Sequence, residues 1–340
     1  MGQNNSKKNK LKSNNNSSIN QQNVKRAKKK NSNIYQLQIN KSYLKYLISI
    51  KEHSDWIESV KLFPSGNIIS VSNDCSIKIY DGLNYKILQN IKSAHKGAIM
   101  NIFVKDENNF ATCSEDKCIN IWIKKNNKFI LKESIINAHN SRITNLIYCT
   151  NDNIISCSED YKIKIWELIK NKYQLLTSLI HSNDICALLF LEDKNLLISS
   201  GYDGTKIWKI YEKGMNIDFF YYFKEVFCGC WNGLNRIDEN RIIVGDEKTL
   251  KIISIKKMKI IKSISIPFRC NGITTIEEKG IFLMGGWSNN IQIYRIHNYK
   301  YLTTIQDAHS GYIVGFCKLN NNLILSFSGD TTMKIWSLNL

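Results

Sequence analysis

Short apolar stretches recur along most of the chain, and Asn, Asp, Ser, Gly and Pro residues separate them. Residues 138–180 show the arrangement most clearly, with apolar-rich runs at 143–149, 153–158, 162–166 and 173–180. Short runs rich in β-branched and aromatic residues and bounded by turn residues are typical of strands. The first three runs are almost continuously apolar, which indicates strands covered on both faces. The pattern therefore predicts four-stranded sheets packed between neighbouring sheets.

The same pattern repeats with a fixed spacing of polar and aromatic residues. His139 precedes Asp160 by 21 residues, and Asp160 precedes Trp166 by six. Four further copies keep this frame: His53, Asp74 and Tyr80; His95, Asp116 and Trp122; His181, Asp203 and Trp208; His309, Asp330 and Trp336. In the copy of His181, the Asp is displaced by one residue. Two weaker copies end at Ile253 and Tyr294. The ends of the seven repeats lie 41 to 45 residues apart, a period typical of stacked repeat architectures.

The two ends of the repeat array complement each other. Residues 43–50 (YLKYLISI) resemble residues 300–305 (KYLTTI), which we expect to form an outer strand between two repeats. The first stretch has no repeat before it, whereas the last repeat ends soon after Trp336 without an outer strand. We therefore predict an all-β ring of seven sheets in which the N-terminal strand completes the last sheet. Closure of this kind leaves only short edges exposed.

Positive charge concentrates before the repeats. The 340 residues carry a formal net charge of +18, and residues 1–33 contain nine basic residues and no acidic one. With few large apolar side chains, this stretch cannot offset its chain entropy by burial. We therefore predict a disordered basic tail over residues 1–34 and a folded domain over residues 41–340. The ten cysteines include no C-x-x-C pair, which favours buried free thiols in a reducing compartment over a metal site.

These repeats resemble the WD repeats of β-propellers, the family of the G-protein β subunits, over residues 41–340. The resemblance implies a seven-bladed β-propeller in which the recurrent His, a Ser or Thr, the Asp and the Trp form a buried hydrogen-bond chain. The matching hydroxyl residues are Ser70, Thr112, Ser156, Ser199 and Ser326. Repeats five and six depart from the pattern, because Val226 and Pro267 stand where His is expected, and we expect apolar blades there.

Few residues are left for catalysis once this chain is assigned. Five of the six histidines occupy the recurrent position, and the sixth, His297, falls in an expected outer strand without an acidic or thiol partner nearby. The sequence contains no glycine-rich phosphate loop and no HExxH or GxSxG motif. We therefore predict a protein that is not an enzyme and that has no cofactor, metal site or small-molecule substrate. Nucleic-acid binding is not expected.

The family usually binds other proteins or peptides, most often on the face formed by the loops just after each His and just before each Asp. Carried over, the resemblance implies a partner-binding face of Trp56, Lys96, Arg142, Asp184, Tyr202, Trp287 and Tyr312, with Glu115 and Glu159. Trp and Tyr are frequent in interface hot spots. The aromatic run at 218–223 (DFFYYF) could dock a partner strand, but we expect it to pack into the core.

The tail carries a motif of its own. Met1–Ser6 (MGQNNS) fits the M-G-x-x-x-S pattern of N-myristoylation at Gly2. The basic residues that follow favour an anionic membrane surface: Lys7, Lys8, Lys10, Lys12, Lys25, Arg26, Lys28, Lys29 and Lys30. We predict a non-catalytic scaffold held at a cytoplasmic membrane face. An alternative is a nuclear scaffold addressed by the cluster at Lys25–Lys30.

Two further alternatives depend on motifs of related propellers. Propellers that serve as ubiquitin-ligase substrate receptors often carry Trp-Asp-x-Arg after the third strand, whereas the corresponding stretches here read YDGL, WIKK, WELI and WKIY. Propellers that bind phosphoinositide headgroups use paired arginines in a Phe-Arg-Arg-Gly stretch, whereas residues 268–272 read FRCNG. Both alternatives are therefore disfavoured.

Overall fold

The computed structural model describes residues 43–149, 152–211, 216–320 and 322–339, which form seven four-stranded antiparallel sheets. Residues 46–338 belong to one compact unit, and the described residues 43–45 and 339 belong to a second, small one. The predicted tail of residues 1–34, with Gly2 and its nine basic residues, lies outside the described residues.

Each sheet is a blade, and in blades one to six the four strands follow one another in sequence. The innermost strands of blades one to seven are β2 (Ile57–Leu62), β6 (Ile99–Asp106), β10 (Ile143–Tyr148), β14 (Ile185–Leu191), β18 (Leu234–Asp238), β22 (Cys270–Ile276) and β26 (Ile313–Asn320). The second strands are β3 (Ile68–Ser72), β7 (Asn109–Ser114), β11 (Ile154–Ser158), β15 (Leu196–Gly201), β19 (Arg241–Gly245), β23 (Ile281–Gly286) and β27 (Leu323–Ser328). The third strands are β4 (Ile77–Tyr80), β8 (Ile119–Lys125), β12 (Lys162–Ile169), β16 (Gly204–Tyr211), β20 (Thr249–Ser254), β24 (Ser288–Arg295) and β28 (Met333–Leu338). The outer strands are β5 (Ile87–Ile91), β9 (Lys128–Ile135), β13 (Lys172–Ile180), β17 (Asn216–Phe223), β21 (Lys259–Ser265), β25 (Tyr301–Ile305) and, for blade seven, β1 (Leu44–Ile50).

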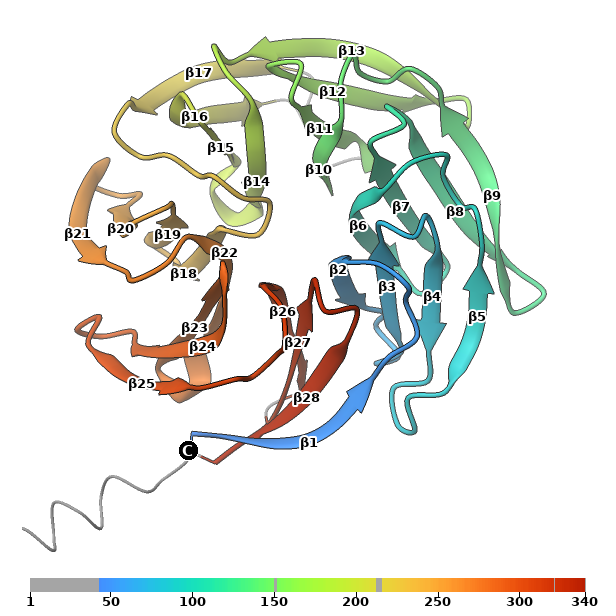
Figure 1. The fold of residues 1–340 in the computed structure, drawn as a ribbon. Coiled ribbons are helices and arrows are strands. Elements are labelled where there is room, and N and C mark those ends of the chain that lie inside the picture. Colours follow the sequence, from blue (N-terminus) through green and yellow to red (C-terminus); the bar gives the residue numbers. More distant parts are fainter. Residues whose placement is uncertain (1–42, 150–151, 212–215, 321, 340) are drawn as a thin grey trace, which may run out of the picture. The chain divides into compact units, whose positions relative to one another are not determined.

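The blades of residues 46–338 follow each other around a ring (Figure 1). Blade seven has the strand order β1-β28-β27-β26, so its outer strand comes from the start of the repeat array. The ring of Tyr46 in β1 meets the indole of Trp336 in β28 edge-on, with 5.7 Å between the ring centroids. The prediction of an all-β seven-bladed propeller closed by its N-terminal strand is therefore confirmed.

The hydrophobic core lies between the blades. One cluster joins Ile69 and Val71 of blade one to Ile102 and Phe110 of blade two, and others join the following pairs of neighbours in the same way. Another cluster joins Ile57 of blade one to residues of blade seven across the closure. Each inner strand is thus covered on both faces, which explains why the first three runs of a repeat are almost continuously apolar.

Bulges recur at one place in the blades. The ladder between the third and outer strands shifts register just before Trp122, Trp166 and Trp208, and equally before Ile253 and Tyr294, where the Trp is replaced. A bulge adds local twist to a strand pair. Because blades five and six keep it, the blade geometry does not depend on the Trp.

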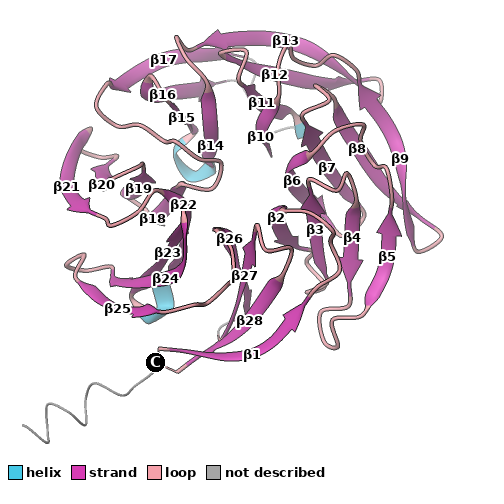
Figure 2. Ribbon diagram, viewed as in Figure 1, coloured by secondary structure: helices cyan, strands magenta, loops and turns pink. Residues whose placement is uncertain are grey.

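Outer strands face away from the core and keep large side chains exposed. Figure 2 shows them along the rim of the ring, with two short 3₁₀ turns, Glu192–Lys194 and Glu277–Lys279, among the loops. Phe219 and Phe220 of β17 are 58% and 48% exposed. The expectation that the aromatic run at 218–223 packs into the core is therefore wrong for these two residues, because the next blade covers the inner strands but not the outer one. Phe223, at the end of the run, is buried.

Candidate functional site

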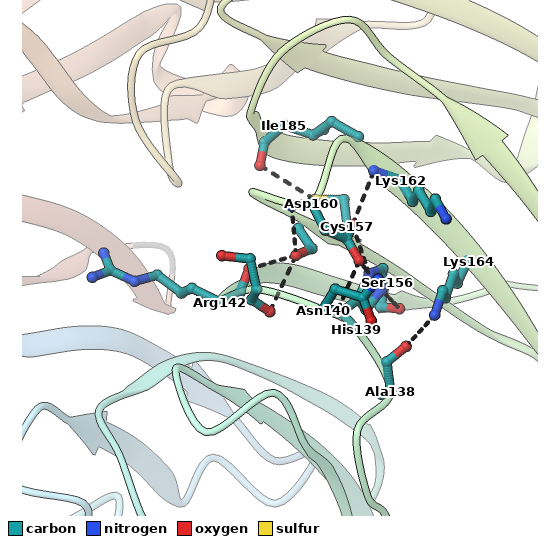
Figure 3. A network of polar contacts seen from close by, with 12 residues as sticks. Ala138, His139, Asn140, Arg142, Ser156, Cys157, Asp160, Lys162, Lys164 and Ile185 are labelled. Atoms are coloured by element: carbon teal, nitrogen blue, oxygen red, sulfur yellow. Dashed lines mark hydrogen bonds and ion pairs between the residues drawn. The ribbon is translucent and has the colours of Figure 1, made fainter.

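The recurrent histidine of blade three sits inside a polar network (Figure 3). Nδ1 of His139 lies 3.0 Å from both carboxylate oxygens of Asp160, and Nε2 lies 2.8 Å from the Ser156 hydroxyl. The indole Nε1–H of Trp166 donates to the same hydroxyl at 2.9 Å. Asp160 also accepts the backbone N–H groups of Asn140 and Lys162. The network ties the loop before the blade to its second and third strands.

Four other blades repeat this network. The distances from His Nδ1 to the Asp carboxylate are 2.8 Å at His53, 3.0 Å at His95, 2.6 Å at His181 and 3.0 Å at His309. Their Nε2 atoms lie 2.7 to 2.8 Å from Ser70, Thr112, Ser199 and Ser326. Nε1 of Trp122, Trp208 and Trp336 donates to the hydroxyl at 2.8 to 2.9 Å, whereas the Tyr80 hydroxyl reaches Ser70 at 3.5 Å.

The electrostatics of the network favour a neutral imidazole facing a carboxylate. Burial lowers the pKa of His139, although the hydrogen bond and charge of Asp160 oppose the shift. Burial alone would raise the pKa of Asp160, but hydrogen bonds from His139 and the backbone outweigh it and lower that pKa to about 2. We therefore assign Nδ1–H as the donor to Asp160 and the Ser156 hydroxyl as the donor to Nε2. The imidazole side chain has no solvent exposure, so the network holds the blade together and does not face a substrate.

A further recurrent contact was missed from the sequence. In blade three, Nζ of Lys164 donates to the backbone oxygen of Ala138, the residue just before the His, at 2.6 Å. The same bond over the same 26-residue separation joins Lys78 to Glu52, Asn120 to Ala94, Lys206 to Ile180, Lys251 to Glu225 and Lys334 to Ala308. The signal was present, because a Lys stands two residues before the aromatic position in the fragments KIY, KIW and KII. Blade five keeps this bond although it lacks the His.

Three exposed aromatic side chains of the predicted partner-binding face form a continuous row. Trp287 of blade six stacks on Tyr312 of blade seven, with centroids 5.3 Å apart and planes inclined by 15°. Trp56 of blade one meets Tyr312 edge-on at 5.9 Å. Gly329 lies beneath Trp56, because a Cβ on this glycine would come within 3.1 Å of the indole. Trp287, Trp56 and Tyr312 are 52%, 41% and 39% exposed.

Two arginines hold the neighbouring loops. The guanidinium of Arg269 lies over the Trp287 ring at 5.2 Å and donates to the Tyr202 hydroxyl at 2.8 Å and to the backbone oxygen of Gly229. Arg142 forms ion pairs with Glu115 and, at 3.7 Å, with Glu159. The first contacts link blades four and six, and the second link blades two and three.

A cavity of about 300 Å³ opens beside the aromatic row. We call it the aromatic cavity. Its lining comes from blades one, two, three, six and seven and from the segment before blade five. The lining includes Trp56, Glu58, Asn73, Arg142, Trp231, Asn232, Arg269 and Trp287. A second cavity of about 380 Å³ is lined by inner strands and shares Trp231 and Asn232 with the first. Asn232 donates to the backbone oxygens of Glu58 and Val314 at 3.4 Å, and Asn145 donates to that of Trp231 at 3.2 Å. The segment of Trp231 and Asn232 is therefore tied to blades one, three and seven and separates the two cavities.

Unpartnered polar atoms gather at the aromatic cavity. Among the described residues, Oδ1 of Asn73, Nε1 of Trp231 and Nε of Arg269 are buried and lack a hydrogen-bond partner, and all three residues line this cavity. Glu58, a carboxylate that is 7% exposed, lines it too. Burial raises the pKa of Glu58 to about 7, while a hydrogen bond from Asn73 and the charge of Arg142 oppose the shift. Buried polar groups normally have partners, so such a concentration marks a candidate binding site.

The structure brings together most, but not all, of the predicted partner-binding face. Trp56, Arg142, Trp287 and Glu115 line the aromatic cavity, Tyr312 stacks between two of them, and Tyr202 joins through Arg269. Lys96 is exposed and Asp184 half-buried, and neither lines the cavity. Glu58 and Trp231 were missed, although an acid within the strand Ile57–Leu62 and a Trp between two repeats are visible in the sequence.

The described part of the chain contains no group of three or more His, Cys, Asp or Glu side chains arranged to hold a metal ion. Nor does any helix there have the length and apolar character needed to span a membrane. None of the ten cysteines, all of which lie in the described ranges, forms a disulfide.

Comparison with known proteins agrees with the repeated blades of the structure. The family profile of the WD domain, G-beta repeat matches residues 44–81, 86–122, 131–167 and 173–209. The chain is also similar to Lissencephaly-1 homolog 1 of Paramecium tetraurelia, with 32% identity over 82 residues. That match covers 23% of this chain and 19% of the relative, so it spans about a fifth of the relative's length.

Proposed function

We propose that this chain, which belongs to the WD-repeat β-propeller family, is a non-catalytic scaffold that gathers protein partners at a cytoplasmic membrane face. WD-repeat propellers generally bind other proteins. Binding of protein partners is therefore the part of the proposal that the family supports directly. The observation that carries it is the exposed row of Trp287, Tyr312 and Trp56 across three neighbouring blades.

The chemistry of this row suits a protein interface. Trp and Tyr supply large rigid surfaces with a polar tip, so their burial gives much contact area for little loss of rotamer entropy. The three rings already contact one another, and Gly329 supports Trp56 from beneath. A partner that covers them therefore meets a surface whose side chains are largely ordered before binding.

A non-catalytic role is supported by where the histidines lie. His53, His95, His139, His181 and His309 each use both ring nitrogens inside a blade, and their side chains have no solvent exposure. A general base must reach the proton it removes. These five residues are therefore committed to holding the fold.

The membrane part of the proposal depends on the tail sequence. A myristoyl chain on Gly2 gives marginal, reversible membrane binding by itself, so a second signal is needed. Each basic residue near an anionic leaflet adds about 1 kcal/mol within a Debye length of about 8 Å. The four lysines within Lys7–Lys12 are closest to the acylated end and contribute most.

The test is membrane fractionation combined with affinity purification, using a native N-terminus and a C-terminal tag. Wild type is expected with membranes, and Gly2→Ala in the soluble fraction with an unchanged melting temperature. Replacing Lys7, Lys8, Lys10 and Lys12 with Gln weakens membrane binding, and raised salt has the same effect. Wild type recovered in nuclei, or Gly2→Ala retained on membranes, contradicts the tether and favours the nuclear alternative at Lys25–Lys30.

The scaffold role is tested on the propeller itself. Trp287→Ala removes the outermost ring of the row and is expected to lose partners that wild type retains. Tyr211→Ala is the control, because Tyr211 is another exposed aromatic residue, 39%, that lies at the end of β16 and outside the row. Equal sets of partners for wild type and Trp287→Ala would contradict binding through this face.

A further inference from the structure

Glu58 is a buried carboxylate that forms no ion pair with a cationic side chain of the described residues. None of the ion pairs between described residues includes Glu58. Arg142 acts on it through its charge, but this guanidinium is shared between Glu115 and Glu159. A buried carboxylate is costly unless a partner neutralises it. Its burial at the aromatic cavity indicates that a ligand supplies the missing charge.

The neighbouring unpartnered atoms narrow the chemistry of that ligand. Oδ1 of Asn73 is an acceptor without a donor, and Asn73 is also bonded to Glu58. Two acceptors side by side require a ligand group with several donors. Nε1 of Trp231 and Nε of Arg269 are donors without acceptors at the same cavity, and a peptide supplies carbonyl oxygens for such groups.

We propose that the aromatic cavity binds an arginine side chain of a protein partner, with its guanidinium paired to Glu58 and Asn73 and its backbone carbonyls accepting from Trp231 and Arg269. This inference rests on the proposed function, because it names what the partner presents to the same face.

A guanidinium fits these groups better than other cations. It is planar, always charged and carries five donors in a fixed fork, so it can satisfy a carboxylate and an amide oxygen together. It also stacks on aromatic faces, and Trp56 and Trp231 both line the cavity. An ammonium has fewer donors and is more strongly hydrated, so it loses more on entering a cavity of about 300 Å³.

The first experiment uses small probes on the full chain. Nα-acetyl-arginine methylamide is titrated into protein labelled with ¹⁵N at tryptophan, and the indole signals of Trp56 and Trp231 are assigned with Trp56→Phe and Trp231→Phe. We expect saturable shifts of both signals at millimolar concentrations. The citrulline analogue, which has the same shape without the charge, is expected to leave them unchanged. Nα-acetyl-lysine methylamide is titrated in the same way. Shifts from the citrulline or lysine analogue that equal those from the arginine probe, or no shift from the arginine probe, would overturn the proposal.

Variants connect the probe to the carboxylate. Glu58→Gln keeps the shape of the side chain and is expected to weaken arginine binding about tenfold or more, since a hydrogen bond to a charged group is lost. Glu192→Gln is the control, because Glu192 lines the second cavity instead. A melting curve for each variant checks that it is folded. Arginine binding by Glu58→Gln that equals that of wild type contradicts the assignment.

Affinity purification separates this inference from the proposed function. Both hold if Glu58→Gln and Trp287→Ala lose the same partners. Partners lost by Trp287→Ala but kept by Glu58→Gln overturn the arginine site and leave the scaffold in place. Partners kept by both variants overturn the proposed function as well.

Discussion

Trp287 and Tyr312 stack face to face although 25 residues and a blade boundary separate them, with ring centroids 5.3 Å apart. Trp56 meets the far side of this pair only because β1 closes the ring and places blade one beside blade seven. The row is therefore a product of closure, and its middle member is Tyr312.

Tyr312→Ala is expected to disrupt the row without unfolding the protein. An aromatic pair contributes about 0.5–1.5 kcal/mol beyond its area burial, and Tyr312 takes part in two pairs, so we expect about 1–3 kcal/mol of lost stability. Partner binding should fall as it does for Trp287→Ala. Urea unfolding and affinity purification measure the two effects. Tyr211→Ala, the control of equal exposure, should keep all partners.

Lys164→Met tests the recurrent bond to the residue before the His. The change keeps most of the side-chain stem but leaves the backbone oxygen of Ala138 without its donor, which lies 2.6 Å away. We expect a loss of about 1–2 kcal/mol in the free energy of unfolding. Lys162→Met, two residues earlier on the same strand, serves as the control and should be near neutral. Equal losses in both variants would mean that the bond contributes nothing specific.

Acid should destabilise the propeller in two steps. The folded pKa values of His139, His181 and His309 lie below the ordinary 6.5, so protonation favours the unfolded chain and stability begins to fall below about pH 6.5. The folded pKa values of Asp116 and Asp160 are lowered from 3.8 to about 2, so their contribution is present above pH 3.8 and is lost as the pH approaches 2. Urea unfolding of Glu58→Gln, which lacks the opposing titration of Glu58 between pH 7 and 4.5, measures both steps, and a constant stability of this variant between pH 7 and 4 would contradict the first.

Glu58→Gln should stabilise the protein at alkaline pH. Because the folded pKa of Glu58 is raised from 4.5 to about 7, its ionisation favours the unfolded chain and lowers stability as the pH rises through this window. At 1.36 kcal/mol per pKa unit, the variant should gain about 3 kcal/mol at pH 8 and little at pH 4.5. Melting curves at the two pH values make the comparison, with the exposed Glu192→Gln as control. A gain that does not depend on pH would point to packing instead of charge.

Two truncations test closure of the ring. Deletion of residues 1–34 is expected to leave the melting temperature of the propeller unchanged. Deletion of residues 1–50 removes β1, exposes the edge of β28 and takes away the contact between Tyr46 and Trp336. We expect aggregation or loss of soluble protein, since an unpaired apolar edge templates association. If the two truncated proteins melt alike, β1 does not stabilise the closed ring.

The repeated unit, the number of blades, the closing strand and the polar network of five blades all follow from the spacing of residues along the chain. The bonds of that network join residues 9 to 22 positions apart inside one repeat, such as His139, Ser156 and Asp160, so their spacing is visible in the chain. The bond from Lys164 to Ala138 also joins two residues of one repeat, 26 positions apart. It was not predicted, although a Lys recurs two residues before the aromatic position of several repeats.

Tertiary structure alone decided the aromatic cavity. Glu58, Trp231 and Arg269 come from blade one, the segment before blade five and blade six, and no spacing in the sequence relates them. Glu58 is 7% exposed at this cavity, and the bonds of Asn232 to the backbone oxygens of Glu58 and Val314 hold the adjoining Trp231 between the two cavities. The exposure of Phe219 and Phe220 was decided in the same way, because burial depends on which strand the next blade covers. Contacts within a repeat are fixed by local spacing, whereas contacts between repeats exist only once the ring has closed.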